Sequence, residues 1–179
     1  MTLDDALTQL RAQIEPGRAE GMRSYHKQER EVLGIPNPAL NDLTKTWRQT
    51  LEVPDRVELA RALWTTDIFE ARIAAAKLLT QARIKNDEPA WDLIQSWVPD
   101  FDSWAIADHV CMAGQKRLVA DPTRLQEVEA WTHSTHMWTR RAALVITLPW
   151  TKQNNPKPCL LYTSPSPRDQ RGSRMPSSA

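Results

Sequence analysis

Two pairs of side chains, each spaced by about one helical turn, carry the clearest chemical signal in the sequence. Trp104 and Asp108 lie four residues apart in a stretch that is typical of a helix, so the indole and the carboxylate share one face. Trp138 and Arg141 lie three residues apart and repeat the pattern with a guanidinium. An aromatic ring, a carboxylate and a guanidinium on neighbouring helices are suited to holding a nucleic-acid backbone beside a reactive carboxylate.

Each of these residues also has an interpretation that involves no chemistry. Trp104 alone is equally compatible with packing in a core, since helical repeats often keep an aromatic residue at one position. Asp108 interrupts an apolar stretch, where a carboxylate is either exposed in a groove or costly to bury without a partner, and this favours a function. His109 points about 100° away from Asp108 on a helix and is more typical of packing than of a catalytic base.

Several other chemistries lack the residues that they need. His133 and His136 have no further ligand at a suitable spacing, and Cys111 is remote from them in an apolar stretch, so we expect no metal site. The sequence contains no glycine-rich phosphate loop, no GxSxG turn and no HExxH helix. We therefore expect no cofactor, no nucleotide hydrolysis of the phosphate-loop type and no zinc peptidase activity.

Helices account for nearly the whole sequence. Glycine is scarce, no alternating strand of useful length occurs, and prolines stand where a first helical turn tolerates them. Asn37 and Asp121, each directly before a proline, are suitable N-caps. The expected helices span 2–14, 17–31, 38–51, 54–65, 67–84, 88–98, 102–119, 122–133 and 135–148.

The helices repeat with a period in the thirties. The prolines that open helices and the tryptophans near the ends of those helices recur at intervals of 33 to 35 residues: Pro54, Pro89 and Pro122, and Trp64, Trp97 and Trp131. Two helices per period indicate an all-α solenoid of antiparallel helix pairs. The second helices of successive pairs would then line one wall. Their first turns carry Glu70 and Arg72, Trp104 and Asp108, and Trp138 and Arg141.

The last 21 residues are set apart from this pattern. Residues 159–179 are rich in Ser, Pro and Arg and resemble the translation of a sequencing-library adapter, so we interpret them as a disordered artefactual tail. We expect the native protein to continue beyond Pro158. The exposed apolar face of a cut solenoid, around Leu144, Ile146, Leu148 and Trp150, would then leave this 179-residue chain poorly soluble and inactive.

Charge and cysteine content narrow the class of protein. The chain carries 23 basic and 22 acidic residues, and removing the tail's three Arg and one Asp leaves 20 and 21, so only a local basic face could bind nucleic acid. One cysteine, Cys111, remains outside the tail, which allows no disulfide framework and is typical of a reducing cytoplasm. No apolar run approaches the length of a membrane span.

The combined motifs resemble the AlkD-like DNA alkylation repair family of HEAT-like repeat DNA glycosylases. The matching residues, in order, are Leu33–Pro38 (LGIPNP), Leu63-Trp64, Glu70-Ala71-Arg72, Trp104 with Asp108, and Trp138 with Arg141. The resemblance implies a HEAT-like α-solenoid over residues 1–158, incomplete at its C-terminus. It also implies excision of positively charged N3- or N7-alkylated purines from double-stranded DNA.

The resemblance also implies roles for particular residues. Asp108 matches the catalytic carboxylate, Trp104 the aromatic residue beside the sugar-phosphate backbone, and Arg141 a basic DNA contact. The candidate sites are therefore Asp108 and Trp104 for catalysis, and Arg141, Trp138, Arg140 and Arg72 for DNA binding. The chain departs from the family at Phe69, where a histidine is frequent, and it lacks a late tryptophan that the family carries beyond Pro158.

Two alternatives to a glycosylase remain open at this point. A solenoid of this kind could bind DNA without catalysis, since relatives of such enzymes can keep the fold and lose the reaction. It could also be a peptide-binding scaffold, which predicts an apolar groove and no salt-dependent affinity for DNA. In each case we expect a monomeric cytoplasmic protein without a metal.

Overall fold

The computed structural model describes the backbone of residues 1–151 and the side chains up to Pro149. These residues form helices and connecting turns, without a strand. The predicted all-α fold class is confirmed. In chain order the helices are α1 (Leu3–Arg11), α2 (Arg18–His26), α3 (Asn37–Thr50), α4 (Val53–Thr65), α5 (Phe69–Leu78), α6 (Glu88–Trp97), α7 (Trp104–Ala120), α8 (Leu125–Trp131) and α9 (Met137–Thr151), with 3₁₀ turns η1 (Val98–Asp100) and η2 (Pro122–Arg124). The predicted segment 159–179, its boundary at Pro158 and the side chain of Trp150 lie outside the described residues.

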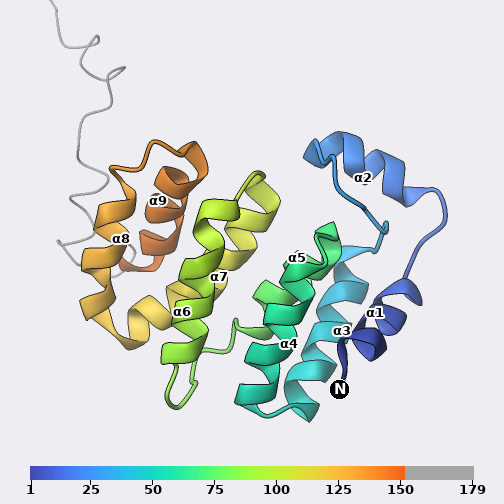
Figure 1. Ribbon diagram of the computed structural model, residues 1–179, viewed down its shortest axis with the longest axis horizontal. Coiled ribbons are helices and arrows are strands. Elements are labelled where there is room, and N and C mark those ends of the chain that lie inside the picture. Colours follow the sequence, from blue (N-terminus) through green and yellow to red (C-terminus); the bar gives the residue numbers. More distant parts are fainter. Residues whose placement is uncertain (152–179) are drawn as a thin grey trace, which may run out of the picture.

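The helices pack in two layers that follow the chain from one end of the molecule to the other (Figure 1). In the inner layer, α3 packs on α5, α5 on α7, and α7 on α9. In the outer layer, α1 packs on α4 and α4 on α6, while α4, α6 and α8 each also contact the inner helix that follows them. Helix α2 stands apart from both layers, at one end of α3 and α5 (Figure 1). This is the stacking of helix pairs that the repeat period predicts.

The periodic tryptophans are the packing residues of the outer layer. The ring of Trp64 stacks on that of Trp97 with centroids 4.3 Å apart, and Trp91 stacks on Trp131 at 6.1 Å. Trp64 and Trp97 occupy equivalent positions of successive repeats, so the interval of 33 residues between them is a direct consequence of the fold, whereas Trp91 lies outside this periodic series. Each such pair stabilises the stack by roughly 1 kcal/mol beyond the area that it buries.

Several predicted helices are longer than the observed ones, and two of them exceed the observed helices by more than five residues. The helix predicted over 17–31 ends at His26, because Lys27 adopts the left-handed conformation (φ +52°) that closes a helix, and the chain then runs extended to Pro36. The helix predicted over 67–84 begins at Phe69 and ends at Leu78. Asn37 is the first helical residue of α3 and makes no cap, whereas Asp121 caps the following turn as predicted, accepting from the backbone N–H of Thr123.

The inner helices approach one another closely because small residues stand between them. Gly114 of α7 faces Ile146 of α9 at a distance that leaves no room for a Cβ atom. Ile146 is therefore buried, and its prediction as part of an exposed apolar face was wrong; Leu144 and Leu148 are 39% and 41% exposed, as predicted. The tight fit at Gly114 fixes the relative positions of α7 and α9, which carry the candidate site.

Buried ion pairs hold the far end of α7. The side chain of Arg117 is fully buried, and its Nη1 lies 3.0 Å from Oδ2 of Asp87. Arg124 donates to both oxygens of the same carboxylate, and these bonds hold the pKa of Asp87 below its usual range. The network joins the turn before α6 to α7 and η2, so the helix that carries Trp104 and Asp108 is anchored at the end opposite to them.

Gly34 is required where the extended segment passes beneath α2, and this gives a testable prediction. Its φ is +83°, and a Cβ atom there would lie 2.8 Å from the backbone nitrogen of Ala19. We expect Gly34→Ala to lower the free energy of unfolding by about 2 kcal/mol or more, from backbone strain and the clash with α2. A Cβ atom added to Gly21, within α2, would meet nothing within 4 Å, so Gly21→Ala should stabilise by up to about 1 kcal/mol. Urea denaturation measures both, and equal effects would contradict the argument.

Candidate functional site

Asp108 and Arg141 form an ion pair between α7 and α9. Nη2 of Arg141 lies 2.9 Å from Oδ2 and 3.1 Å from Oδ1 of Asp108, and Nε lies 3.3 Å from Oδ1. The two side chains are 32% and 43% exposed, so the carboxylate is neither sealed in the core nor fully solvated. A pair this exposed contributes little to stability, about 0–1 kcal/mol, and its main effect is to fix the direction of the carboxylate.

Trp104 begins α7, one helical turn before Asp108. The side chain of Ser103 caps the helix by accepting from the backbone N–H of Ile106, and this places the indole at the very end of the helix. Trp104 is 40% exposed, so it is not the core residue that its repeat position also allowed. The structure thus presents an aromatic face and a carboxylate on successive turns of one helix.

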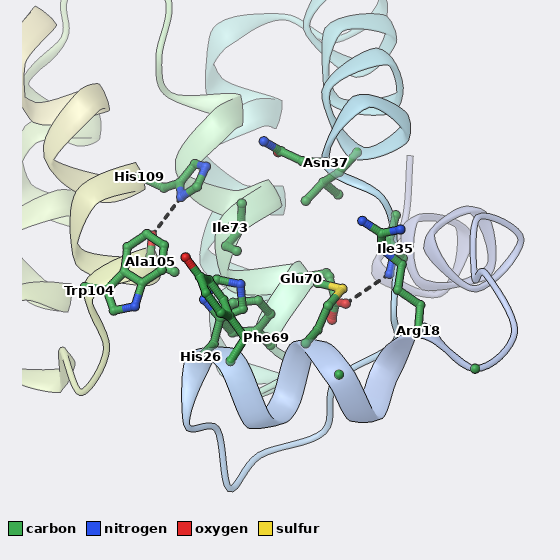
Figure 2. Close-up of a pocket in the computed structure, with 15 residues that line it drawn as sticks. Arg18, His26, Ile35, Asn37, Phe69, Glu70, Ile73, Trp104, Ala105 and His109 are labelled. Atoms are coloured by element: carbon green, nitrogen blue, oxygen red, sulfur yellow. Dashed lines mark hydrogen bonds between the residues drawn. The ribbon is translucent and has the colours of Figure 1, made fainter.

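An aromatic cluster, made of Tyr25, His26, Phe69 and Trp104, surrounds this indole. The ring of His26 lies 5.1 Å from that of Trp104 and 4.9 Å from that of Phe69, while Tyr25 meets the indole edge-on at 6.0 Å. Figure 2 shows His26 and Trp104 next to each other among the residues that line a cavity. His26 and Tyr25 were not predicted from the sequence, because α2 lies outside the repeats and its contact with α7 is set only by the tertiary fold.

His26 brings an imidazole to Phe69, the position where the family resemblance leads one to expect a histidine. Its ring is held between Phe69 and Trp104, and Nδ1 is buried without a hydrogen-bond partner among the described residues. Burial lowers the pKa of His26, and the charge of Glu70 only partly opposes this effect. The ring is therefore neutral at physiological pH and acts as a flat packing surface rather than as a cation.

A cavity of about 630 Å³ opens between α2 and the inner helices α3, α5 and α7. The aromatic cluster forms one side of it, Met22, Ile35, Leu40 and Ile73 give it apolar walls, and Arg18 and Asn37 supply polar groups. Its volume and mixed lining are typical of a site for a small organic group. Asp108 does not line it, so Trp104 separates this cavity from the Asp108–Arg141 pair.

His109 lines the cavity from α7, the helix that also carries Trp104, and is held in one tautomer. Nδ1 lies 2.7 Å from the backbone oxygen of Ala105, so this nitrogen carries the proton and donates it (Figure 2). Burial is the main cause of a lowered pKa of His109, and the ring is neutral. This agrees with the sequence interpretation of His109 as a packing residue.

Glu70 is a buried anchor rather than a group on the inner surface. Its side chain is 1% exposed, and its oxygens accept from the backbone N–H groups of Leu33, Gly34 and Ile35 at 2.8, 2.7 and 3.1 Å. The expectation that Glu70 joins the polar wall was wrong, because three buried donors of the extended segment require an acceptor. Glu70 thereby fixes the segment that carries α2 over the cavity.

Arg72 makes its contacts at the junction of α4 and α5, with Trp64 and Asp67. Its guanidinium lies 4.6 Å above the ring of Trp64, its Nη2 is 2.9 Å from Oδ1 of Asp67, and 12% of the side chain is exposed. Burial is the main cause of a lowered pKa of Arg72, with the nearby Arg30 adding to it. Arg72 is thus not brought together with Asp108.

The two remaining candidates on α9 differ from each other. Trp138 is half-buried and packs against the core. Arg140 is exposed, and its Nη1 donates to the backbone oxygens of Ser134 and Thr135, both at 2.8 Å. Among the predicted DNA contacts, it is Arg141 that the structure joins to Asp108.

The described residues contain no group of three or more His, Cys, Asp or Glu side chains that could hold a metal ion. Cys111, one turn beyond Asp108, is fully enclosed, and burial raises the pKa of its thiol far above the usual range. Between residues 1 and 151, none of the helices has the length and apolar character needed to span a bilayer.

Comparison with known proteins adds one finding to this geometry. A family model described as DNA alkylation repair enzyme matches residues 6–170, which is most of the chain and reaches into the segment 159–179. A search of the curated proteins gives no match.

The anchoring role of Glu70 is tested by removing its charge. Glu70→Gln offers an N–H₂ group to backbone donors that need an acceptor, so we expect the free energy of unfolding to fall by about 2–3 kcal/mol. Glu58→Gln is the matched control, because Glu58 is exposed and makes one weak pair with Arg61 at 3.8 Å; it should change stability by less than about 0.5 kcal/mol. Urea denaturation of both variants makes the comparison, and a neutral Glu70→Gln would rule out the anchor.

Proposed function

The chain belongs to the DNA alkylation repair enzyme family, and from this premise we propose that it is a glycosylase that releases positively charged N3- and N7-alkylated purines from duplex DNA. The observation that carries the proposal is the partly exposed carboxylate of Asp108, held by Arg141 one turn from an exposed indole.

The chemistry of the substrate explains why one carboxylate is enough. An alkylated purine that carries a positive charge leaves the sugar as a neutral base, so no general acid has to protonate it. Positive charge develops on the deoxyribose as the bond breaks, and an oriented anion beside the sugar stabilises it. Asp108 supplies this anion and can also orient the attacking water.

Arg141 has two roles in this proposal. In the free protein it holds both oxygens of Asp108, which keeps the carboxylate in one orientation before DNA arrives. It is also 43% exposed, so its remaining N–H groups can reach a backbone phosphate from the same position. A phosphate that shares the guanidinium would draw positive charge away from Asp108 and leave more of its negative charge for the sugar.

Trp104 provides the flat surface beside this carboxylate. Because the indole stands at the end of α7 and is 40% exposed, a deoxyribose placed against it would lie within one helical turn of Asp108. Contact with the ring excludes water from one side of the sugar, and this strengthens the interaction between the carboxylate and the developing charge.

The alternative is a protein of this family that binds DNA without cleaving the glycosidic bond. An ion pair between helices can serve packing alone, so what favours the glycosylase is that this carboxylate is partly exposed and lies one turn from an exposed indole. Loss of base release without loss of binding, on neutralising Asp108, separates the two proposals.

We expect Asp108→Asn to lower the single-turnover rate of 7-methylguanine release by about 100- to 1,000-fold, because an oriented charge is lost at the reacting sugar. Its affinity for undamaged duplex should stay within about threefold of the wild type, because Arg141 and the other cations remain. The measurement quantifies free 7-methylguanine from a methylated duplex with enzyme in excess. Asp92→Asn, an exposed position on α6 in the outer layer, is the matched control and should leave the rate unchanged.

We also propose that the native protein continues beyond Pro158, so the assay is run on the 179-residue chain and on a longer protein that carries this continuation. Release of base by the 179-residue chain would contradict the expectation that this chain is inactive. Duplex binding without base release by the longer protein would contradict the glycosylase and favour the non-catalytic alternative.

A further inference from the structure

A second hollow, of about 250 Å³, lies on the inner layer beside the aromatic cavity. Helix α3 contributes Asn41, Lys45 and Arg48 to it, α5 contributes Lys77, and α7 contributes His109 and Met112. His109 also lines the aromatic cavity, so the two hollows meet at this residue, next to Asp108 in the chain. We refer to the second one as the basic hollow.

Three cations that face the basic hollow are not matched by a carboxylate. Lys45, Arg48 and Lys77 make no ion pair within 4 Å among the residues that the structure describes. Asp42 also lines the hollow, is exposed and pairs with none of them, so the lining carries an excess of positive charge. By contrast, each of the buried guanidinium groups elsewhere in this part of the chain, in Arg30, Arg72, Arg117 and Arg124, lies against a carboxylate.

Arg48 and Lys77 are held in place by neutral partners. Nζ of Lys77 donates to the side-chain oxygen of Asn41 at 2.7 Å, and Nη1 of Arg48 donates to the backbone oxygen of Lys77 at 2.6 Å. Partial burial, and next the charge of Arg48, lower the pKa of Lys77, which reflects two cations that lie close together in a half-buried site. Each keeps further N–H donors, so an anion in the hollow would gain hydrogen bonds and relieve the repulsion.

We propose that the basic hollow binds a backbone phosphate of the DNA duplex through Lys77, Arg48 and Lys45. This inference rests on the proposed function, since it takes duplex DNA to be the ligand. A phosphate suits the site because a point-charge ammonium and a planar guanidinium converge on it, and phosphate oxygens accept from both. DNA is favoured over a free anion because His109 lines both this hollow and the cavity that carries Trp104, so the hollow lies beside the candidate site on the inner layer.

The position of the basic hollow, far from Arg141, means that a phosphate bound there would help to orient the duplex. Arg141 lies on α9, whereas the cations of the hollow lie on α3 and α5, so two to three helix spacings of about 8–10 Å separate them, roughly 16–30 Å in all. One phosphate cannot reach both sites. Two phosphate contacts this far apart fix the direction and register of a duplex along the inner layer, and so set which deoxyribose meets Trp104 and Asp108.

The test removes one charge at a time and measures affinity for undamaged duplex over a series of salt concentrations. Lys77→Gln keeps a polar side chain near Asn41 and should weaken binding about 3- to 10-fold at about 0.1 M salt. It should also reduce the slope of log K against log salt by about one. Lys45→Gln should act in the same direction, and because both cations serve one phosphate, the double variant should also lose about one in slope while binding more weakly than either single variant. Arg48 is left intact because its bond to the backbone of α5 supports the fold.

Arg61→Gln is the matched control, since it removes the same charge from an exposed position on α4 in the outer layer and should leave the salt slope unchanged. A Lys77→Gln protein with an unfolding midpoint like that of the wild type but an unchanged salt slope would overturn the proposal. Competition by inorganic phosphate that depends on Lys77, with unaltered duplex binding, would also overturn it and identify a free-anion site.

The two proposals fail separately, because this experiment uses undamaged DNA. A reduced salt slope in Lys77→Gln, together with no base release by the wild type, would support the phosphate site and reject the glycosylase. Base release that depends on Asp108, with the salt slope of Lys77→Gln unchanged, would support the glycosylase and reject the phosphate site.

Discussion

The close packing of α5, α7 and α9 is the constraint on which the rest of the structure depends. Helix α5 lies between α3 and α7 and is buried over nearly its whole surface; Ala71, Ala74, Ala75 and Ala76 let its neighbours approach. Gly114 does the same where α7 meets α9. Since a solenoid buries each helix pair only against its neighbours, these small residues set the spacing of the inner layer. That spacing allows one guanidinium on α9 to reach both oxygens of a carboxylate on α7.

The sequence predicted the parts of this arrangement that repeat. The helix starts at prolines, the recurrence of tryptophan and the placing of Asp108 and Arg141 on neighbouring inner helices all follow from one period of 33 to 35 residues. The sequence did not predict the contacts that the non-repeating N-terminal segment makes with the inner helices. The burial of Glu70 depends on three backbone donors some 35 residues earlier, and backbone donors leave no trace in residue type. His26 and Tyr25 join Trp104 through a contact between α2 and α7 that no spacing encodes.

The amino-acid composition does not show how unevenly charge is distributed over this protein. The whole chain carries 23 basic and 22 acidic residues, which argues against a nucleic-acid partner when it is taken as an average. The structure distributes these charges unevenly, because arginines inside the fold are matched by Asp67, Asp87 and Asp102. The matched pairs cancel at short range, whereas Lys45, Arg48 and Lys77 on the inner layer have no such partner among the described residues. A local field is therefore compatible with a net charge near zero.

The Asp108–Arg141 pair connects this distribution of charge to the proposed chemistry. A carboxylate without a cation beside it, on a surface that binds phosphate, would repel DNA. A carboxylate paired with a buried cation would be too fully neutralised to stabilise a positively charged sugar. At 32% and 43% exposure the pair lies between these limits. The guanidinium offsets the repulsion while the duplex approaches, and a bound phosphate then competes for the same N–H groups. On the proposed function, the binding of the backbone itself raises the effective negative charge that Asp108 presents to the deoxyribose, so docking and catalysis are coupled through one arginine.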